Sequence, residues 1–140
     1  RNGLAVTAFA GCHHELIAAA DLVLVASGTT TLEVALHEKP MIVMYNASRV
    51  FYHLIARWLI QTPYLSLPNL LAGRRIVPEF MPYYRSVEPI AACALDLLQS
   101  VEAAEQMRRE LHEAVQPLRA SAASRRTAEI LLKLAGGYGV

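Results

Sequence analysis

The chain has 140 residues, of which 54% are hydrophobic and 18% are charged. That length is enough for one domain with a sizeable core, and the composition is typical of a globular protein rather than a disordered one. The 13 basic residues are nearly matched by 12 acidic residues, which gives a net charge of +1. A dedicated nucleic-acid-binding protein is therefore disfavoured, and no apolar run approaches the ~18 residues that cross a bilayer.

The first elements of the chain predict a strand followed by a short helix. Leu4–Phe9 has the pattern of a strand, Gly11 that of its turn, and about Cys12–Ala20 that of a helix. His13 and His14 stand at this turn, but adjacent helical residues point roughly 100° apart and no third ligand is nearby, which disfavours a metal site. A solvated helix start and a polar rim to a ligand crevice remain as alternatives.

The centre of the chain predicts a βαβ unit. Leu22–Ala26 is a short valine-rich run, typical of a strand buried on both faces, and it is closed by a turn at Ser27–Thr29. A helix is expected from Thr30 until His37–Pro40 stops it, and Met41–Tyr45 then repeats the pattern of a buried strand. The turn would lie at the carboxyl end of a parallel strand and the amino end of a helix, where an anion is favoured.

Two interpretations of Glu33 are open. Thr30 followed three residues later by Glu33 fits a capping box. The alternative is a carboxylate that accepts the hydroxyls of a ribose whose phosphates rest on the helix start. A hydrolase elbow around Ser27 is excluded because Val25 stands where that motif needs glycine, and neither G-x-G-x-x-G nor a Walker motif is present.

The middle of the chain is less regular. About Arg49–Ile60 predicts a helix whose aromatic and apolar stripe suits either the core or an interface with a membrane or acyl chain. Thr62–Asn69 is expected to be a brief extended piece that ends in a polar loop, and Leu70–Gly73 is too short for a stable helix alone. Arg74-Arg75 precedes the apolar residues of 76–80, and such a loop is costly to order unless it binds something.

The last third of the chain is helical by pattern. Helices are expected over about 88–99, 101–116 and 121–134, the last of them ended by Gly136-Gly137. Two apolar stripes are predicted, formed by Ala104, Met107, Leu111 and Val115 and by Thr127, Ile130, Leu131 and Leu134. The two cysteines, Cys12 and Cys93, fall in predicted helices and show no metal-ligand spacing, so buried free thiols in a reducing compartment are expected.

Several runs closely resemble the carboxyl-terminal half of the lipid-A-disaccharide synthase family, over about Ala19–Phe80. They are Ala26-Ser27-Gly28-Thr29 with Leu32-Glu33, Pro40-Met41-Ile42-Val43 with Tyr45, the run Pro63-Tyr64-Leu65-Ser66-Leu67-Pro68-Asn69-Leu70-Leu71-Ala72-Gly73-Arg74, and Val77-Pro78-Glu79. The third run is specific to that family, whereas Ser-Gly-Thr with a downstream Glu indicates only the broader class of GT-B-type nucleotide-sugar glycosyltransferases. The chain departs from the family pattern at Arg75 and at Met81-Pro82.

This resemblance implies transfer of a diacylated glucosamine from its UDP donor to a lipid monosaccharide phosphate, in lipid A biosynthesis, with no cofactor and no required metal. It implies that Ser27, Gly28 and Thr29 meet the UDP diphosphate and that Glu33 meets the ribose. Asn69, Arg74 and Glu79 are implied at the donor or its loop, with no firm role for Glu79. The catalytic base and the acceptor site are expected in an amino-terminal half that this chain lacks.

The expected fold is therefore α/β: a partial doubly wound, Rossmann-like parallel sheet followed by C-terminal helices. Residues 1–86 would form a truncated nucleotide-sugar-binding domain, and residues 87–140 would be helices packing on it. The start at Arg1 without methionine suggests a piece of something longer, which would be inactive alone. In the usual strand order, two absent strands would lie between Leu4–Phe9 and Leu22–Val25.

Because such a gap cannot persist, either the two strands pair directly or an exposed edge recruits a second chain, and a homodimer or another strand-exchanged assembly is the favoured expectation. The resemblance further implies a cytoplasmic protein that is peripheral to the inner membrane. The competing interpretation is a non-catalytic α/β nucleotide-binding or protein-interaction module, which affinity for UDP would distinguish.

Overall fold

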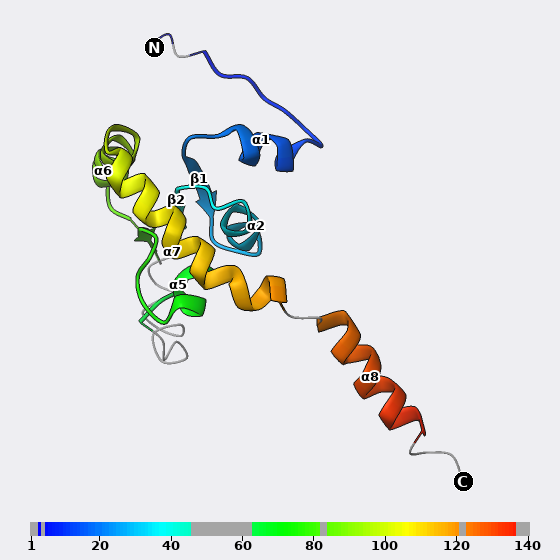
Figure 1. Ribbon diagram of the computed structural model, residues 1–140. Helices are drawn as coiled ribbons and strands as arrows, with labels where there is room; N and C mark the ends of the chain where they lie inside the picture. The colour runs from blue at the N-terminus through cyan, green and yellow to red at the C-terminus, as the bar shows by residue number, and fades with distance from the viewer. Residues whose placement is uncertain (1–2, 4, 46–62, 82–83, 121–122, 137–140) are drawn as a thin grey trace.

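A computed structural model describes residues 3, 5–45, 63–81, 84–120 and 123–136 of the chain. The described part is α/β, as the sequence predicts, with a parallel sheet and helices around it (Figure 1). The predicted helix at 49–60 lies outside the described residues. The elements in chain order are α1 His13–Ala19, β1 Val23–Ala26, α2 Thr30–Leu36, β2 Met41–Met44, α5 Leu67–Ala72, β3 Glu79–Phe80, α6 Glu88–Gln99, α7 Val101–Ala120 and α8 Ala123–Gly136.

The sheet of the described residues has the strand order β1-β2-β3, and both pairings are parallel. Strand β1, helix α2 and strand β2 therefore form the predicted βαβ unit. Ala26 pairs with Met44, and Met44 pairs with Phe80, so the carboxyl ends of the three strands are level with one another. This register places the turn after β1 at the edge of the sheet where ligands of doubly wound folds bind.

Strand β2 is the buried strand of the sheet, whereas β1 is an edge strand. Met41, Ile42 and Val43 have no exposed surface, as the apolar run predicts. On β1 only Val25 is buried and Leu24 is 56% exposed, so the prediction that this strand is buried on both faces is wrong. The reason is that Val25 packs in the core with residues of α2, whereas Leu24, on the opposite face of the strand, is left more than half uncovered.

The strand predicted at Leu4–Phe9 is also wrong for the residues that the structure describes there. Residues 5–9 belong to no strand, and Val6 and Phe9 are 87% and 61% exposed. Figure 1 shows this amino-terminal stretch running away from the sheet beyond α1. A strand is stable only when its backbone groups pair with a neighbour, and this stretch pairs with no strand of the described sheet.

Helix α5 and strand β3 replace a stretch that the sequence predicts as extended chain and loop. The helix begins after Ser66, has Pro68 in its first turn and ends at Gly73, whose φ of 64° is the left-handed conformation that glycine favours at a helix end. Its six residues contact α7 and α2. Tertiary packing therefore stabilises a helix that is too short to be stable alone.

Helix α7 covers the core through the apolar stripe that the sequence predicts. Met107, Leu111 and Val115, spaced four residues apart, are buried with residues of β1, β2 and α2 in one cluster. Helix α8 differs, since its described apolar side chains at 130, 131, 132 and 134 are all more than half exposed. Figure 1 shows α8 standing apart from the sheet.

Helix α2 ends in a backbone arrangement that ties it to α7. Glu38 has a φ of 54°, and its N–H and that of Lys39 bond to the carbonyls of Ala35 and Val34, which is a Schellman motif. Glycine usually takes this position, but here the carboxylate of Glu38 accepts a hydrogen bond from His112 Nδ1 at 2.8 Å and pairs with Arg119 Nη1 at 2.9 Å. The side chain thus joins the end of α2 to α7.

Leu111→Ala is expected to lower the free energy of unfolding by about 2–5 kcal/mol, because Leu111 has no exposed surface and a cavity would remain. Urea denaturation measures this change. Leu132→Ala is the matched control, because Leu132 is 72% exposed, and it should change stability by no more than about 0.5 kcal/mol. Equal effects of the two substitutions would contradict the position of the core.

Glu38→Gln is expected to destabilise the fold at neutral pH and to have a vanishing effect in acid. The hydrogen bond from His112 is the largest cause that lowers the pKa of Glu38, and Arg119 adds to it. A carboxylate with a lowered folded-state pKa stabilises the fold above its unfolded pKa, and that contribution is lost as the pH falls through the folded value. Urea denaturation of both proteins at pH 6.5 and at pH 3 tests this, and a stability difference that is independent of pH would refute it.

Candidate functional site

The turn at Ser27–Thr29 leads from the carboxyl end of β1 into α2. Gly28 has a φ of 151°, and among the described atoms a Cβ added there would meet nothing within 4 Å. Thr31 is fully buried, and its hydroxyl donates a hydrogen bond to the carbonyl of Gly28 at 2.7 Å. The turn is therefore fixed from the inside, while Gly28 and Thr29 remain exposed to a ligand.

Glu33 lies one turn into α2, and the capping-box interpretation of this residue is wrong. The helix starts at Thr30 with Thr29 as its N-cap, and no side-chain cap hydrogen bond is formed there within the described residues. Instead, Glu33 Oε2 lies 3.8 Å from Nε2 of His13, the first residue of α1. The carboxylate is thus turned toward the neighbouring helix rather than back toward its own helix start.

Three histidines lie in a row near the start of α1 and the end of α2, and His13 is the one that faces Glu33. The ring centroids of His13 and His14 are 4.1 Å apart, and His37, which follows α2, lies 5.7 Å from His14. Although the row is rich in imidazoles, no group of three or more His, Cys, Asp or Glu in the described part of the chain is placed to hold a metal ion. The three imidazoles therefore form a polar surface between α1 and the end of α2.

A cavity of about 450 Å³ opens between α1, β1 and α2. His13, Ser27 and Thr30 line it together with apolar residues that include Ile17, Val25 and Val34. Its volume lies within the usual range for sites that bind small molecules. The cavity therefore brings one histidine of the row to the same space as the turn after β1.

Asn69 is fully buried and bonds within the protein. Its Oδ1 accepts hydrogen bonds from the backbone N–H groups of Ile76 and Val77 at 2.6 and 2.9 Å. Its Nδ2 donates to the carbonyl of Val77 at 2.9 Å and to Glu79 Oε1 at 2.7 Å. These four bonds use the full capacity of the amide, so Asn69 links α5 to the segment before β3.

Glu79 is the acceptor at the centre of the same network. Besides Asn69, the N–H and hydroxyl of Ser66 donate to Oε1 at 2.9 and 2.5 Å, and the N–H of Leu65 donates to Oε2 at 3.2 Å. Sequence reasoning missed Ser66, although a serine before Leu-Pro-Asn is a recognisable N-cap signal. Arg74 lies outside this network and pairs with Glu110 of α7 at 2.7 Å.

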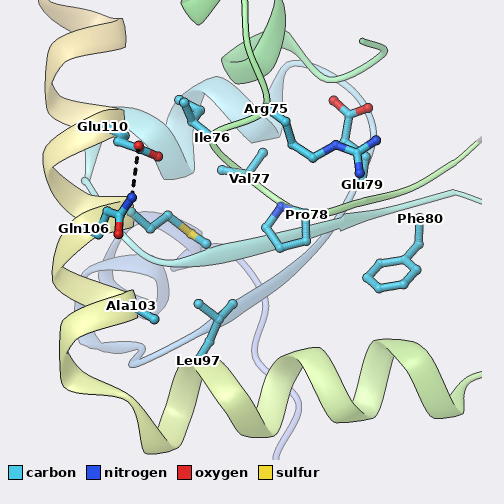
Figure 2. A pocket seen from close by; sticks show the side chains of 11 residues that line it. Arg75, Ile76, Val77, Pro78, Glu79, Phe80, Leu97, Ala103, Gln106 and Glu110 are labelled. Atoms are coloured by element: carbon cyan, nitrogen blue, oxygen red, sulfur yellow. Dashed lines mark hydrogen bonds between the residues drawn. The ribbon is translucent and has the colours of Figure 1, made fainter. Parts of the chain in front are cut away.

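A second cavity, of about 410 Å³, lies between β3, α6 and α7. Figure 2 shows Ile76, Val77 and Pro78 facing Gln106 and Glu110 of α7, which are joined by a hydrogen bond of 3.4 Å. Leu97 and Met107 add apolar surface. This cavity borders the start of β3.

The structure thus gathers the residues singled out from the sequence into two groups. Ser27, Gly28, Thr29 and Glu33 lie with His13 around the carboxyl end of β1, and Asn69 and Glu79 lie with Ser66 between α5 and β3.

None of the helices in the described ranges is long and apolar enough to cross a membrane.

Comparisons with a family model and with individual proteins all match this chain to lipid-A-disaccharide synthases. The family model described as lipid-A-disaccharide synthetase matches residues 2–133. A lipid-A-disaccharide synthase of Azotobacter vinelandii is 43% identical over 135 residues, which are 96% of this chain and 34% of that protein. A lipid-A-disaccharide synthase of Pseudomonas aeruginosa is 40% identical over 134 residues, which are 96% of this chain and 34% of that protein. One of Cellvibrio japonicus is 41% identical over 92 residues, which are 66% of this chain and 24% of that protein.

The chain therefore spans about a third of the length of the first two of these relatives. The matched residues include the turn after β1, Glu33, and the Asn69 and Glu79 network. Since the family model covers nearly all of the sequence, the chain belongs to the lipid-A-disaccharide synthetase family.

Proposed function

We propose that this chain is the UDP-sugar donor-binding part of a glycosyltransferase of lipid A biosynthesis. The whole enzyme would join UDP-2,3-diacylglucosamine to a lipid monosaccharide phosphate. The observation that carries the proposal is the open Ser27–Thr29 turn with Glu33 one helical turn away, in a chain that belongs to this family. The names of the relatives agree with it.

In this proposal the diphosphate lies against Ser27, Gly28 and Thr29, and Glu33 accepts hydrogen bonds from the ribose. Open space beside Gly28 supports a close approach of the phosphates to the backbone. The level carboxyl ends of the strands support a ligand at this edge. The failure of Glu33 to form a capping box leaves its carboxylate available for a ligand.

Asn69, Arg74 and Glu79 are proposed to serve the donor site through the loop that they shape. The buried amide of Asn69 and the carboxylate of Glu79 join α5 to β3, and Arg74 joins the end of α5 to α7. Such a network would keep the segment after α5 in one conformation when the donor binds.

The acceptor site and the catalytic base are proposed to lie in the two-thirds of the relatives that this chain does not match. Donor binding without an acceptor site supplies neither proximity nor a base, so glycosyl transfer would need that part. A lipid acceptor would bring the whole enzyme to a membrane surface, as a peripheral protein.

A homodimer or strand-exchanged assembly is proposed as well. Its support is the edge of β1, which carries an exposed Leu24 and pairs on one side only in the described sheet. Exposed strand edges recruit further strands. Light scattering over a range of concentrations should give a mass above that of the 15.4 kDa chain, and a monomer at the highest concentration would count against the assembly.

Glu33→Gln is expected to weaken UDP binding about ten- to a hundredfold, because hydrogen bonds to a charged acceptor contribute roughly 1.5–3 kcal/mol. Calorimetric titration of UDP into both proteins measures the change. Glu113→Gln, on the exposed surface of α7, is the control and should bind UDP like wild type.

Gly28→Val tests the phosphate side of the same site. It should reduce UDP binding because a side chain would fill the open space, but its folding must be checked first, since a φ of 151° is unfavourable for valine.

Equal UDP affinities of wild type and Glu33→Gln would remove the ribose role of Glu33. No affinity of the wild-type chain for UDP would favour a non-catalytic interaction module.

A further inference from the structure

His13 and Glu33 face one another across a distance that leaves both side chains free to bind a third group. The Nε2 and Oε2 atoms are 3.8 Å apart, which exceeds the ~3.2 Å limit of a direct hydrogen bond. The two side chains are 62% and 38% exposed, so a ligand can reach both. His13 belongs to α1 and Glu33 to α2, so the packing of two separate helices sets the gap between the two side chains.

A hydroxyl group has the chemistry that such a gap fits. It carries one hydrogen to donate and lone pairs to accept with, so one oxygen at roughly 2.8 Å from each atom can accept from the imidazole N–H and donate to the carboxylate. We propose that His13 is a donor-binding residue that holds one ribose hydroxyl together with Glu33. This inference rests on the proposed function, because it takes the ligand of Glu33 to be the ribose of a UDP-sugar.

The surroundings of His13 support this role. Its side chain lines the same cavity as Ser27 and Thr30, so ribose and diphosphate subsites would be continuous. The His14 ring, 4.1 Å away between centroids, restricts the orientation of His13. Within the described residues, the titratable side chains in contact with His13 are thus Glu33 of α2 and His14 of its own helix.

An ordinary surface ion pair between His13 and Glu33 is the alternative, and it would contribute little to stability or binding. The two explanations differ in what removal of the imidazole does to nucleotide affinity. A surface pair predicts no change, whereas a ribose contact predicts a loss that depends on the ribose hydroxyl.

The experiment is calorimetric titration of the 140-residue chain, as wild type and as His13→Ala, with UDP, 2′-deoxy-UDP and 3′-deoxy-UDP. His13→Ala is expected to weaken UDP binding roughly three- to tenfold, the effect of one lost hydrogen bond. One of the two deoxy nucleotides should bind wild type more weakly than UDP and lose little further affinity in His13→Ala. Thermal unfolding checks that this exposed substitution leaves the fold intact.

His37→Ala is the matched control, because it removes another imidazole of the same row whose ring contact is with His14 rather than with Glu33, and its UDP affinity should stay within about twofold of wild type. UDP binding by wild type that His13→Ala leaves unchanged would overturn this inference alone. If His13→Ala weakens the binding of UDP, 2′-deoxy-UDP and 3′-deoxy-UDP by the same factor, that result would also overturn the inference. Wild type without affinity for UDP would overturn the proposed function and this inference with it.

Discussion

The burial of β2 beneath α7 is the constraint on which the rest of the structure depends. Met41, Ile42 and Val43 have no exposed surface, and the N–H of Met41 even points to the sulfur of Met107, at 3.4 Å. A parallel strand with both faces covered needs a neighbour on each side and an element over each face. Strands β1 and β3 supply the neighbours, and the stripe of α7, which includes Leu111, supplies one cover.

The candidate site follows from that arrangement. Because β2 sets the register of both neighbours, the strands end level and the turn after β1 opens at their common edge. Helix α2 is held over the sheet at its far end by Glu38 and α7, so its first turn keeps Glu33 opposite His13. The contact between Glu38 and α7 therefore lies at the opposite end of α2 from the ligand edge.

Asn69 and Glu79 illustrate how polar residues in a family-specific run can support a site from within the protein. A buried amide without partners would cost free energy, so all four hydrogen-bonding positions of Asn69 are used by the chain itself. The carboxylate of Glu79 likewise gathers the N–H groups that precede α5. This network joins α5 to a segment whose Ile76 and Val77 lie in the core, and the sequence singled out Asn69 and Glu79 but neither Ser66 nor the bonds among them.

The sequence by itself determined the βαβ unit, the turn at Ser27–Thr29, the buried strand Met41–Met44 and the stripe of α7, because local periodicity and turn residues specify them. Only the tertiary structure decided which strand lies at the edge, that residues 5–9 pair with nothing in the described sheet, and that Leu67–Ala72 is a helix. It also decided that Glu33 faces His13 rather than its own helix start. Each of these features depends on contacts between residues far apart in the chain, and such contacts leave no periodic signal in a single sequence.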